Sequence, residues 1–304
     1  MSNKTATSLW LTAHIKINPI LEEAVIDFLV GVMSGAVDQS VDHQGSDLPL
    51  IVYFEEKDMD EQSRLQLQNK VEKQLSILAD IFQVNEPEIS WKRIEDQDWS
   101  SNWKKHFKPF TITEGLSIVP TWEKYQPKAN EQVITMDPGM AFGTGHHATT
   151  SLSLDLLRQI IANNDKKDLS VLDVGCGTGI LGMGAALFGA TKVLGIDNDP
   201  EAVRVATENV TLNKCDSVMK VSITPLSELT QPFDCIVANI IHDVLITMIG
   251  DFKRLTVPNG SLVLSGILQG DQEHNIIEQF EKGGFTLIKN RKENEWAALY
   301  LKKN

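Results

Sequence analysis

The sequence contains few cysteines and lacks a long apolar segment. Three of its 304 residues are cysteines and none belongs to a Cys-x-x-Cys pair, which argues against a disulfide framework and against a zinc site. No apolar run reaches the roughly 18 to 20 residues that a membrane-spanning helix needs, and the first residues lack the apolar core of a signal peptide. We therefore expect reduced thiols, no membrane association and a cytoplasmic location.

Positive charge is scarce as well. The chain has 28 Lys and Arg against 41 Asp and Glu, for a formal net charge of -13. Broad nucleic-acid surfaces depend on basic side chains that displace counterions from phosphates, so direct nucleic-acid binding is not expected. Residues 1–95 hold 16 of the acidic and 8 of the basic side chains. This asymmetry favours a basic macromolecular partner, although solubility alone also explains it.

The first third of the chain alternates between strand-like and helix-like segments. Residues 9–17 alternate as in a strand, and the apolar spacing that follows Pro19 predicts a helix to about Met33. Two strands, a helix and a last strand are expected at 36–41, 50–54, 60–82 and 88–94. The order β-α-β-β-α-β is typical of a ferredoxin-like domain, which we predict over residues 1–94.

An aromatic segment follows this domain. Trp99, Trp103 and Phe107 recur every four residues, a spacing that places them on one face of a helix. We interpret residues 95–108 as a linker helix and residues 109–304 as a second, larger domain.

Strands and helices alternate in the larger domain. Segments 110–122 and 133–136 look like strands, and Thr149 or Thr150 can cap the helix that follows. Seven later strands are expected at 171–174, 192–197, 219–223, 235–239, 261–265, 285–289 and 297–301, with helices at 179–188, 200–213, 241–255 and 270–282. This order predicts an α/β, doubly wound, mainly parallel sheet. Ligands of such sheets bind at the carboxyl ends of the strands.

A glycine-rich turn follows the first of these seven strands. Gly175, Gly177 and Gly179 stand between a strand and a helix, which is the context of a nucleotide-binding turn. Asp197 ends the next strand, where its carboxylate can accept both ribose hydroxyl protons. These residues indicate an adenosine-type ligand, although a nicotinamide dinucleotide would also use such an acid.

Asp173 helps to distinguish S-adenosylmethionine from a nicotinamide dinucleotide. It stands two residues before Gly175, in a turn one residue shorter than the dinucleotide fingerprint. A carboxylate there is unfavourable beside a pyrophosphate and favourable beside the ammonium and sulfonium of S-adenosylmethionine. We therefore predict S-adenosylmethionine as the cofactor. The alternative for Asp173 is a side chain that stabilises the turn.

Asn239 ends the fourth strand, within Val-Ala-Asn-Ile at 237–240. Amino-group methyltransferases commonly carry Asn or Asp here, and its oxygen can orient the acceptor amine toward the methyl–sulfur bond. The two prolines and the aromatic residue that usually follow are missing, which favours a flexible aliphatic amine. The alternative is that Asn239 only caps the next helix.

A metal site is not expected. His146 and His147 near Asp137 project in divergent directions, and methyl transfer needs no metal. No acid–base dyad is recognisable, so we expect direct displacement in which positioning dominates. Three rivals stay open: a nicotinamide-dependent oxidoreductase, a nonenzymatic adaptor, and a methyltransferase that acts on another protein or on nucleic acid.

Three motifs together resemble one family: residues 138–150, 171–179 and 237–240 are similar to the bacterial methyltransferases of large-subunit ribosomal protein eleven, the stalk-base protein. The connector from Asp98 to Pro109 and the sequence Asn-Glu-Trp at 294–296 look similar too. The resemblance implies a seven-stranded class I S-adenosylmethionine-dependent methyltransferase sheet.

The resemblance also implies roles for particular residues. It implies that Thr150, Gly175, Asp197 and Asn239 contact the cofactor, and that Phe142 and the loop around Gly143 close over it. It implies a first domain that binds the ribosomal protein, free or before assembly, and that swings relative to the second domain. The expected products are trimethylated lysine ε-amino groups and a trimethylated α-amino terminus. The sequence does not indicate an oligomeric state, so a monomer is the default expectation.

Overall fold

The computed structural model describes residues 9–29, 33, 36–38, 50–56, 59–95, 108–137 and 148–304. The chain divides into two compact units, which meet in sequence between Lys108 and Pro109. Of the predicted linker helix at 95–108, the structure describes only Glu95 and Lys108. Glu95 belongs to strand β4 (Glu88–Glu95).

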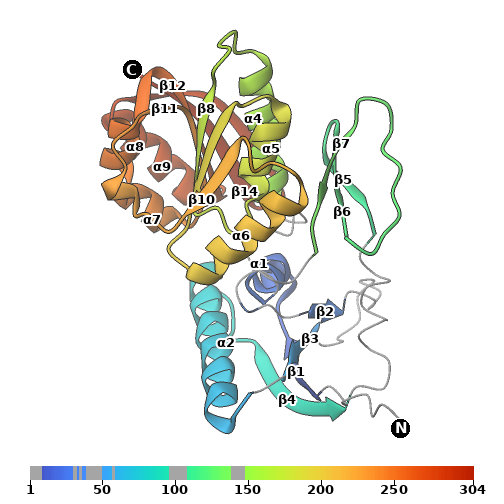
Figure 1. Ribbon diagram of the computed structural model, residues 1–304. Coiled ribbons are helices and arrows are strands. Elements are labelled where there is room, and N and C mark those ends of the chain that lie inside the picture. Colours follow the sequence, from blue (N-terminus) through green and yellow to red (C-terminus); the bar gives the residue numbers. More distant parts are fainter. Residues whose placement is uncertain are drawn as a thin grey trace. The chain divides into compact units, whose positions relative to one another are not determined.

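The first unit contains a four-stranded antiparallel sheet with strand order β2-β3-β1-β4 (Figure 1). The elements in chain order are β1 (Leu9–Lys16), η1 (Pro19–Leu21), α1 (Glu22–Asp27), β2 (Ala36–Asp38), β3 (Leu50–Glu55), α2 (Glu61–Phe82) and β4 (Glu88–Glu95). This order and pairing confirm the predicted ferredoxin-like topology. The helix predicted from Pro19 onward begins as a single 3-10 turn. The Asn18 side chain fixes this start, because it accepts a hydrogen bond from the Ile20 amide.

The core of the first unit lies between this sheet and its helices. Alternate residues of β1 and β3 point to the same face and are fully or almost fully buried, and one side of α2 packs against them. The main contributors are Leu11, Ala13, Ile15, Val52, Phe54, Val71 and Leu75. Burying each large apolar side chain contributes roughly 1.5–3 kcal/mol to the folded state.

The second unit contains a seven-stranded sheet with strand order β10-β9-β8-β11-β12-β14-β13. Its strands are β8 (Ser170–Val174), β9 (Lys192–Ile196), β10 (Met219–Ser222), β11 (Phe233–Asn239), β12 (Thr256–Leu268), β13 (Phe285–Glu293) and β14 (Trp296–Lys303). Strand β14 runs opposite to the other six strands, which share one direction. The predicted doubly wound, mainly parallel sheet is confirmed, and its topological switch lies between β8 and β11.

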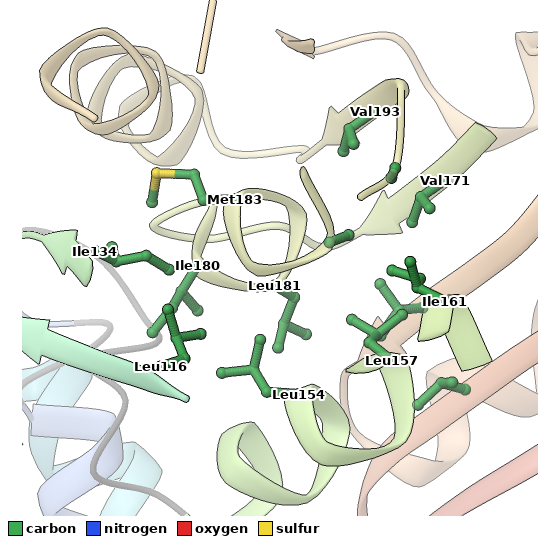
Figure 2. Packing of buried hydrophobic residues seen from close by; sticks show 14 of the residues in the cluster. Leu116, Ile134, Leu154, Leu157, Ile161, Val171, Ile180, Leu181, Met183 and Val193 are labelled. Carbon is green, nitrogen blue, oxygen red and sulfur yellow. The ribbon is translucent and has the colours of Figure 1, made fainter. Parts of the chain in front are cut away.

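Helices cover both faces of this sheet (Figure 1). One core joins the strands to α4 (Ala148–Ala162), α5 (Ile180–Phe188) and α6 (Pro200–Leu212); Figure 2 shows Leu154 and Leu157 of α4 beside Leu181 of α5. The other core contains residues of α7 (His242–Thr247), α8 (Ile249–Leu255) and α9 (Asp271–Lys282).

Several predicted bounds were wrong. The helix expected at 241–255 is two helices that meet at Met248. Thr149 and Thr150 lie inside α4 rather than before it, so neither is its N-cap. Strand β13 extends well beyond the predicted apolar segment, because pairing with β14 satisfies the backbone of its polar end. Strand β12 also begins earlier than predicted, at Thr256, which pairs with Phe233 of β11.

A smaller sheet packs against α4 and α5 within the second unit. It consists of β5 (Phe110–Thr113), β6 (Leu116–Val119) and β7 (Gln132–Thr135), so the strand-like segment 110–122 is a hairpin that turns at Gly115. Figure 2 shows Leu116 and Ile134 from this sheet beside Ile180 of α5. The small sheet thus shares the core of the larger one.

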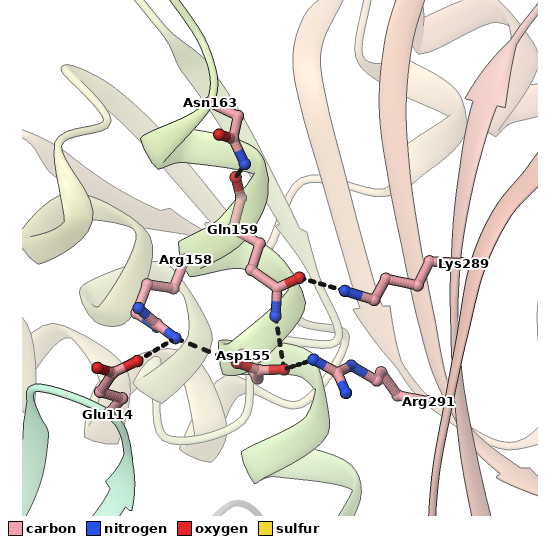
Figure 3. Close-up of polar contacts among 7 residues, drawn as sticks. All are labelled: Glu114, Asp155, Arg158, Gln159, Asn163, Lys289 and Arg291. Carbon is pink, nitrogen blue, oxygen red and sulfur yellow. Dashed lines mark hydrogen bonds and ion pairs between the residues drawn. The ribbon is translucent and has the colours of Figure 1, made fainter.

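Polar side chains tie α4 to elements on both sides of it (Figure 3). Arg158 forms an ion pair with Glu114 of the β5–β6 turn at 2.8 Å, and Asp155 pairs with Arg291 of β13 at 3.1 Å. Gln159 donates to Asp155 and accepts from Lys289. Exposed pairs of this kind contribute about 0–1 kcal/mol each, so their main effect is on the orientation of α4.

Within the described ranges, no helix is both long and apolar enough to cross a membrane.

Candidate cofactor and acceptor site

The glycine turn between β8 and α5 has a backbone that only glycine adopts readily. Gly175, Gly177 and Gly179 all have positive φ values, of 68°, 53° and 81°. The Gly175 and Cys176 amides donate to the Ile196 carbonyl oxygen at the end of β9, at 2.9 and 3.0 Å. The turn is thereby fixed at the carboxyl edge of the sheet, where the fold places ligands.

Gly175 also allows a close approach between the turn and the end of β11. A Cβ atom on Gly175 would lie 2.7 Å from Cγ2 of Ile240, closer than packed atoms allow. Ile240 directly follows Asn239, so the predicted cofactor turn touches the predicted acceptor segment. Glycine is therefore favoured at position 175 for two separate reasons, the positive φ and the lack of space for a Cβ atom.

Asp197 faces the turn from the end of β9. Its Oδ2 accepts a hydrogen bond from the Gly177 amide at 2.9 Å, and its Oδ1 accepts one from the Asp199 amide at 3.0 Å. Each carboxylate oxygen has two lone-pair sites, so both can accept a further hydrogen bond. Because Asp197 is only half-buried, a ribose could reach it.

A cavity of about 350 Å³ lies beside Asp197, within the usual size range of ligand pockets. Of the residues that were predicted to bind the cofactor, Gly175 and Asp197 line it, whereas Asp173, Gly177, Thr150 and Asn239 do not. The remaining wall is mainly apolar and comes from the ends of β8 and β9, the segment after β10 and the residues from 240 to 248: Val174, Ile196, Asn198, Ile223, Thr224, Pro225, Leu226, Ile240, Val244 and Met248.

Sequence reasoning did not identify the wall formed by residues 223–226. The end of the predicted strand at 219–223 was a usable signal, because every parallel strand of this sheet ends at the same edge. Val244 and Met248 carried no such signal, since Val244 lies in α7 and Met248 lies between α7 and α8, where the predicted bounds were wrong.

Asp173 is fully buried and lies below the turn. Its Oδ2 accepts a hydrogen bond from the Gly182 amide in α5 at 2.8 Å, while Oδ1 has no partner among the described residues. Burial raises the pKa of the Asp173 carboxyl to about 7; the Gly182 hydrogen bond opposes this shift and the negative charge of Asp197 adds to it. One oxygen thus has a structural role in holding α5, and the other is left for a positive or donor group.

Thr150 and Asn239 lie on the same face of the sheet as Asp173. Residues of β8 and β11 alternate between the two cores, so Asp173 and Asn239 point toward the α4 side, from which Thr150 comes. Thr150 is fully buried and its hydroxyl has no partner within the described chain. Asn239 is 8% exposed, and its side chain makes no hydrogen bond with any described residue.

Native proteins rarely leave buried polar atoms unpaired. Here Asp173 and Thr150 each have a buried, unpaired side-chain oxygen, next to a glycine turn and a largely apolar cavity that ends in a ribose-type acid. An adenosine with an attached ammonium and carboxylate supplies partners for these groups and apolar surface for the cavity. The residues therefore fit S-adenosylmethionine.

Some predicted residues cannot be placed. Phe142, Gly143, His146 and His147 lie outside the described residues. Asp137 uses both carboxylate oxygens to accept from the amide and the hydroxyl of Thr121, each at 2.8 Å. In the part of the chain that the structure describes, no group of three or more His, Cys, Asp or Glu side chains could hold a metal ion.

The strand order, the glycine turn and the acid after the second parallel strand define a class I methyltransferase, whose cofactor is S-adenosylmethionine. Residues 9–304 match the model of the family described as ribosomal protein L11 methyltransferase (PrmA). The chain belongs to this family, as the sequence motifs had indicated.

Individual relatives agree with this assignment. The chain is similar to the ribosomal protein L11 methyltransferase of Desulfotalea psychrophila, at 46% identity over 97% of this chain and 98% of that protein. The protein of the same name from Geotalea daltonii is 35% identical over 96% and 98% of the two chains. The crystal structure of ribosomal protein L11 methylase from Lactobacillus delbrueckii subsp. bulgaricus covers 65% of this chain and 100% of its own, with 32% identity and a TM-score of 0.59.

Proposed function

We propose that this chain transfers methyl groups from S-adenosylmethionine to amino groups of ribosomal protein L11. Membership of the L11 methyltransferase family supports the client and the reaction class. The observation that carries the proposal for the acceptor is the place of Asn239 at the end of β11, where its side chain makes no hydrogen bond with any described residue.

Each part of the site has a proposed role toward the cofactor. Asp197 accepts the ribose hydroxyls, Gly175 and Gly177 bring the turn close to the cofactor, and the apolar wall of the cavity encloses the adenine. Asp173 and Thr150 serve the amino-acid end. We also propose, from the family resemblance, that Phe142 and the loop around Gly143 cover the bound cofactor.

The acceptor is proposed to be a neutral, aliphatic amine. A lysine side chain has a pKa near 10.4 in water, and desolvation beside a cationic sulfonium lowers it, which favours the reactive form. The Asn239 side-chain oxygen accepts an amine N–H and directs the nitrogen lone pair along the methyl–sulfur bond. The new N–C bond forms as the S–C bond breaks, the sulfur keeps that electron pair, and the amine releases its proton to water.

The first unit is proposed to recognise the client. L11 is the proposed partner, free or before assembly, and the acidic first third of the chain suits a basic protein. We further propose that the enzyme is a cytoplasmic monomer without direct nucleic-acid contacts. Repeated transfer to lysine ε-amino groups and to the α-amino terminus would give trimethylated products.

Mass spectrometry of L11 tests this proposal. Purified chain, S-adenosylmethionine and free L11 are incubated, and the expected result is mass increments of whole methyl groups on lysines and on the amino terminus, grouped in threes. Parallel incubations with assembled ribosomes and with ribosomal RNA test the state of the client. Absence of increments on L11, or methylation of the RNA alone, would refute the proposed client. Binding of a nicotinamide dinucleotide in place of S-adenosylmethionine would refute the reaction class.

A further inference from the structure

Helix α7 begins three residues after Asn239, and its start has little local support. Its N-cap residue, Ile241, forms no capping hydrogen bond through its side chain and is 68% exposed. The helix is only six residues long. A short helix without a capping side chain depends on tertiary contacts for its position.

His242 provides such a contact. Its Nε2 lies 3.1 Å from Oδ1 of Asn275 in α9, and its Nδ1 lies 2.7 Å from Oδ1 of Asp243. The His242 side chain is 15% exposed, whereas that of Asp243 is 92% exposed. The bond to Asn275 is therefore the shielded one, and it joins the first residue of α7 to a helix whose Ile276 is fully buried in the core.

Ile240 lies between Asn239 and the start of α7, and two other segments fix its position. The Ile240 amide donates to the Ser265 carbonyl oxygen at 3.2 Å. A Cβ atom on Gly266 would lie 2.6 Å from the Ile240 carbonyl oxygen, and one on Gly175 would lie 2.7 Å from its side chain. The segment is thus fixed at Ile240 by β12 and the glycine turn, and at His242 by α9.

We propose that His242 is a positioning residue for methyl transfer: through its hydrogen bond to Asn275 it sets the path of residues 239–242, and hence the direction of the Asn239 side chain. This inference rests on the proposed function. His242 touches neither the cofactor cavity nor the acceptor in the proposed arrangement, and it acts through the backbone. In-line attack is sensitive to such placement, since a misplacement of about 1 Å can cost about 100-fold in rate.

A double-mutant cycle in the full chain tests the contact. His242→Ala and Asn275→Ala are each expected to lower kcat for L11 methylation about 10- to 100-fold, while affinity for S-adenosylmethionine falls by a clearly smaller factor, because only the edge of the cavity wall is loosened. The double variant should be no worse than the poorer single variant, because both remove the same bond. His242→Gln, which keeps a donor at similar reach, should recover part of the rate.

A matched control removes a bond elsewhere in the same unit. Thr286→Ala loses the exposed hydrogen bond between Thr286 and Asn304 and should leave kcat unchanged. Additive losses in the cycle, an equal loss of cofactor affinity, or unchanged kcat in His242→Ala would each overturn the proposal.

Amide hydrogen exchange separates this proposal from the proposed function. In both single variants the Ile240, Val244 and Leu245 amides should exchange faster than in the parent chain, and those of β9 should not. If the parent chain fails to methylate L11, the client assignment fails while the exchange result still decides the role of His242. Unchanged exchange at these three amides contradicts the inference whatever the client.

Discussion

The carboxylate of Asp197 accepts a hydrogen bond from the Gly177 amide at 2.9 Å, so the acid after β9 and the glycine turn after β8 form one structural unit. Under the proposed function, these two motifs, separated in sequence, offer the cofactor a backbone turn and a hydrogen-bond acceptor at a fixed spacing. A change in either residue is expected to disturb both.

Asp197→Ala is expected to weaken S-adenosylmethionine binding by about 10- to 100-fold, because hydrogen bonds to a charged group contribute about 1.5–3 kcal/mol. Calorimetric titration measures the change. Asp216→Asn is the control, since Asp216 accepts from Thr211 at an exposed position outside the cavity. Equal affinities for Asp197→Ala and the parent chain would contradict the role of Asp197.

Gly175→Ala is expected to destabilise the protein by about 1–3 kcal/mol, because its φ of 68° and its contact with Ile240 leave no place for a methyl group. Gly250→Ala is a matched control: Gly250 lies in α8, nothing lies within 4 Å of its added Cβ, and alanine favours a helix by about 0.5–1 kcal/mol. Thermal unfolding of the two variants should shift in opposite directions. A shift of the same sign would disprove the explanation.

Asn239→Ala is expected to lower kcat for L11 methylation about 100-fold while cofactor affinity stays within about 3-fold, because the amide orients the acceptor and does not line the cavity. Single-turnover rates with saturating cofactor give the first quantity and titration gives the second. Asn213→Ala tests whether any loss of a hydrogen-bonded amide has this effect, since the half-buried Asn213 side chain bonds only to backbone groups in this unit. Full turnover by Asn239→Ala would remove the positioning role.

Asp173 makes stability depend on pH in the absence of cofactor. The pKa of the Asp173 carboxyl in the folded state, about 7, lies above the ordinary 3.8. Protonation of Asp173 therefore stabilises the folded state fully below pH 4, and this stabilisation is lost as the pH rises to 7. The parent chain should lose unfolding free energy relative to Asp173→Asn over this interval, by at most about 1.4 kcal/mol per pH unit. Urea unfolding at pH 5 and 8 measures the difference. Parallel pH profiles of the two proteins would show that Asp173 is not the group concerned.

Glu56→Gln should destabilise the first unit by about 1–3 kcal/mol. The Glu56 side chain is 1% exposed and pairs with Arg64 of α2 and, at 2.8 Å, with Arg93 of β4, so it joins a helix to an edge strand. Lys16→Ala removes an exposed pair with Glu88 and should change stability by less than about 1 kcal/mol. Denaturant unfolding distinguishes the two, and equal effects would contradict the importance of burial.

Element type and order were accessible from the sequence because they depend on local periodicity. The alternation of apolar residues in β1 and the helical spacing in α2 survive in the structure almost to the residue. The end of β13 did not, because its polar residues are held in a strand by pairing with β14, which no local pattern reveals. The same limit applies to Met248, where one predicted helix is two.

The sequence by itself determined that the glycine turn, Asp197 and Asn239 stand at strand ends, and their roles at the site stay predictions. Only the tertiary structure decided that one Asp173 oxygen accepts from the Gly182 amide while the other has no partner among the described residues. It also decided that residues 223–226 form a cavity wall. The physical reason is that strand ends are a local property, whereas burial, unpaired polar atoms and close contacts arise only when distant segments pack together.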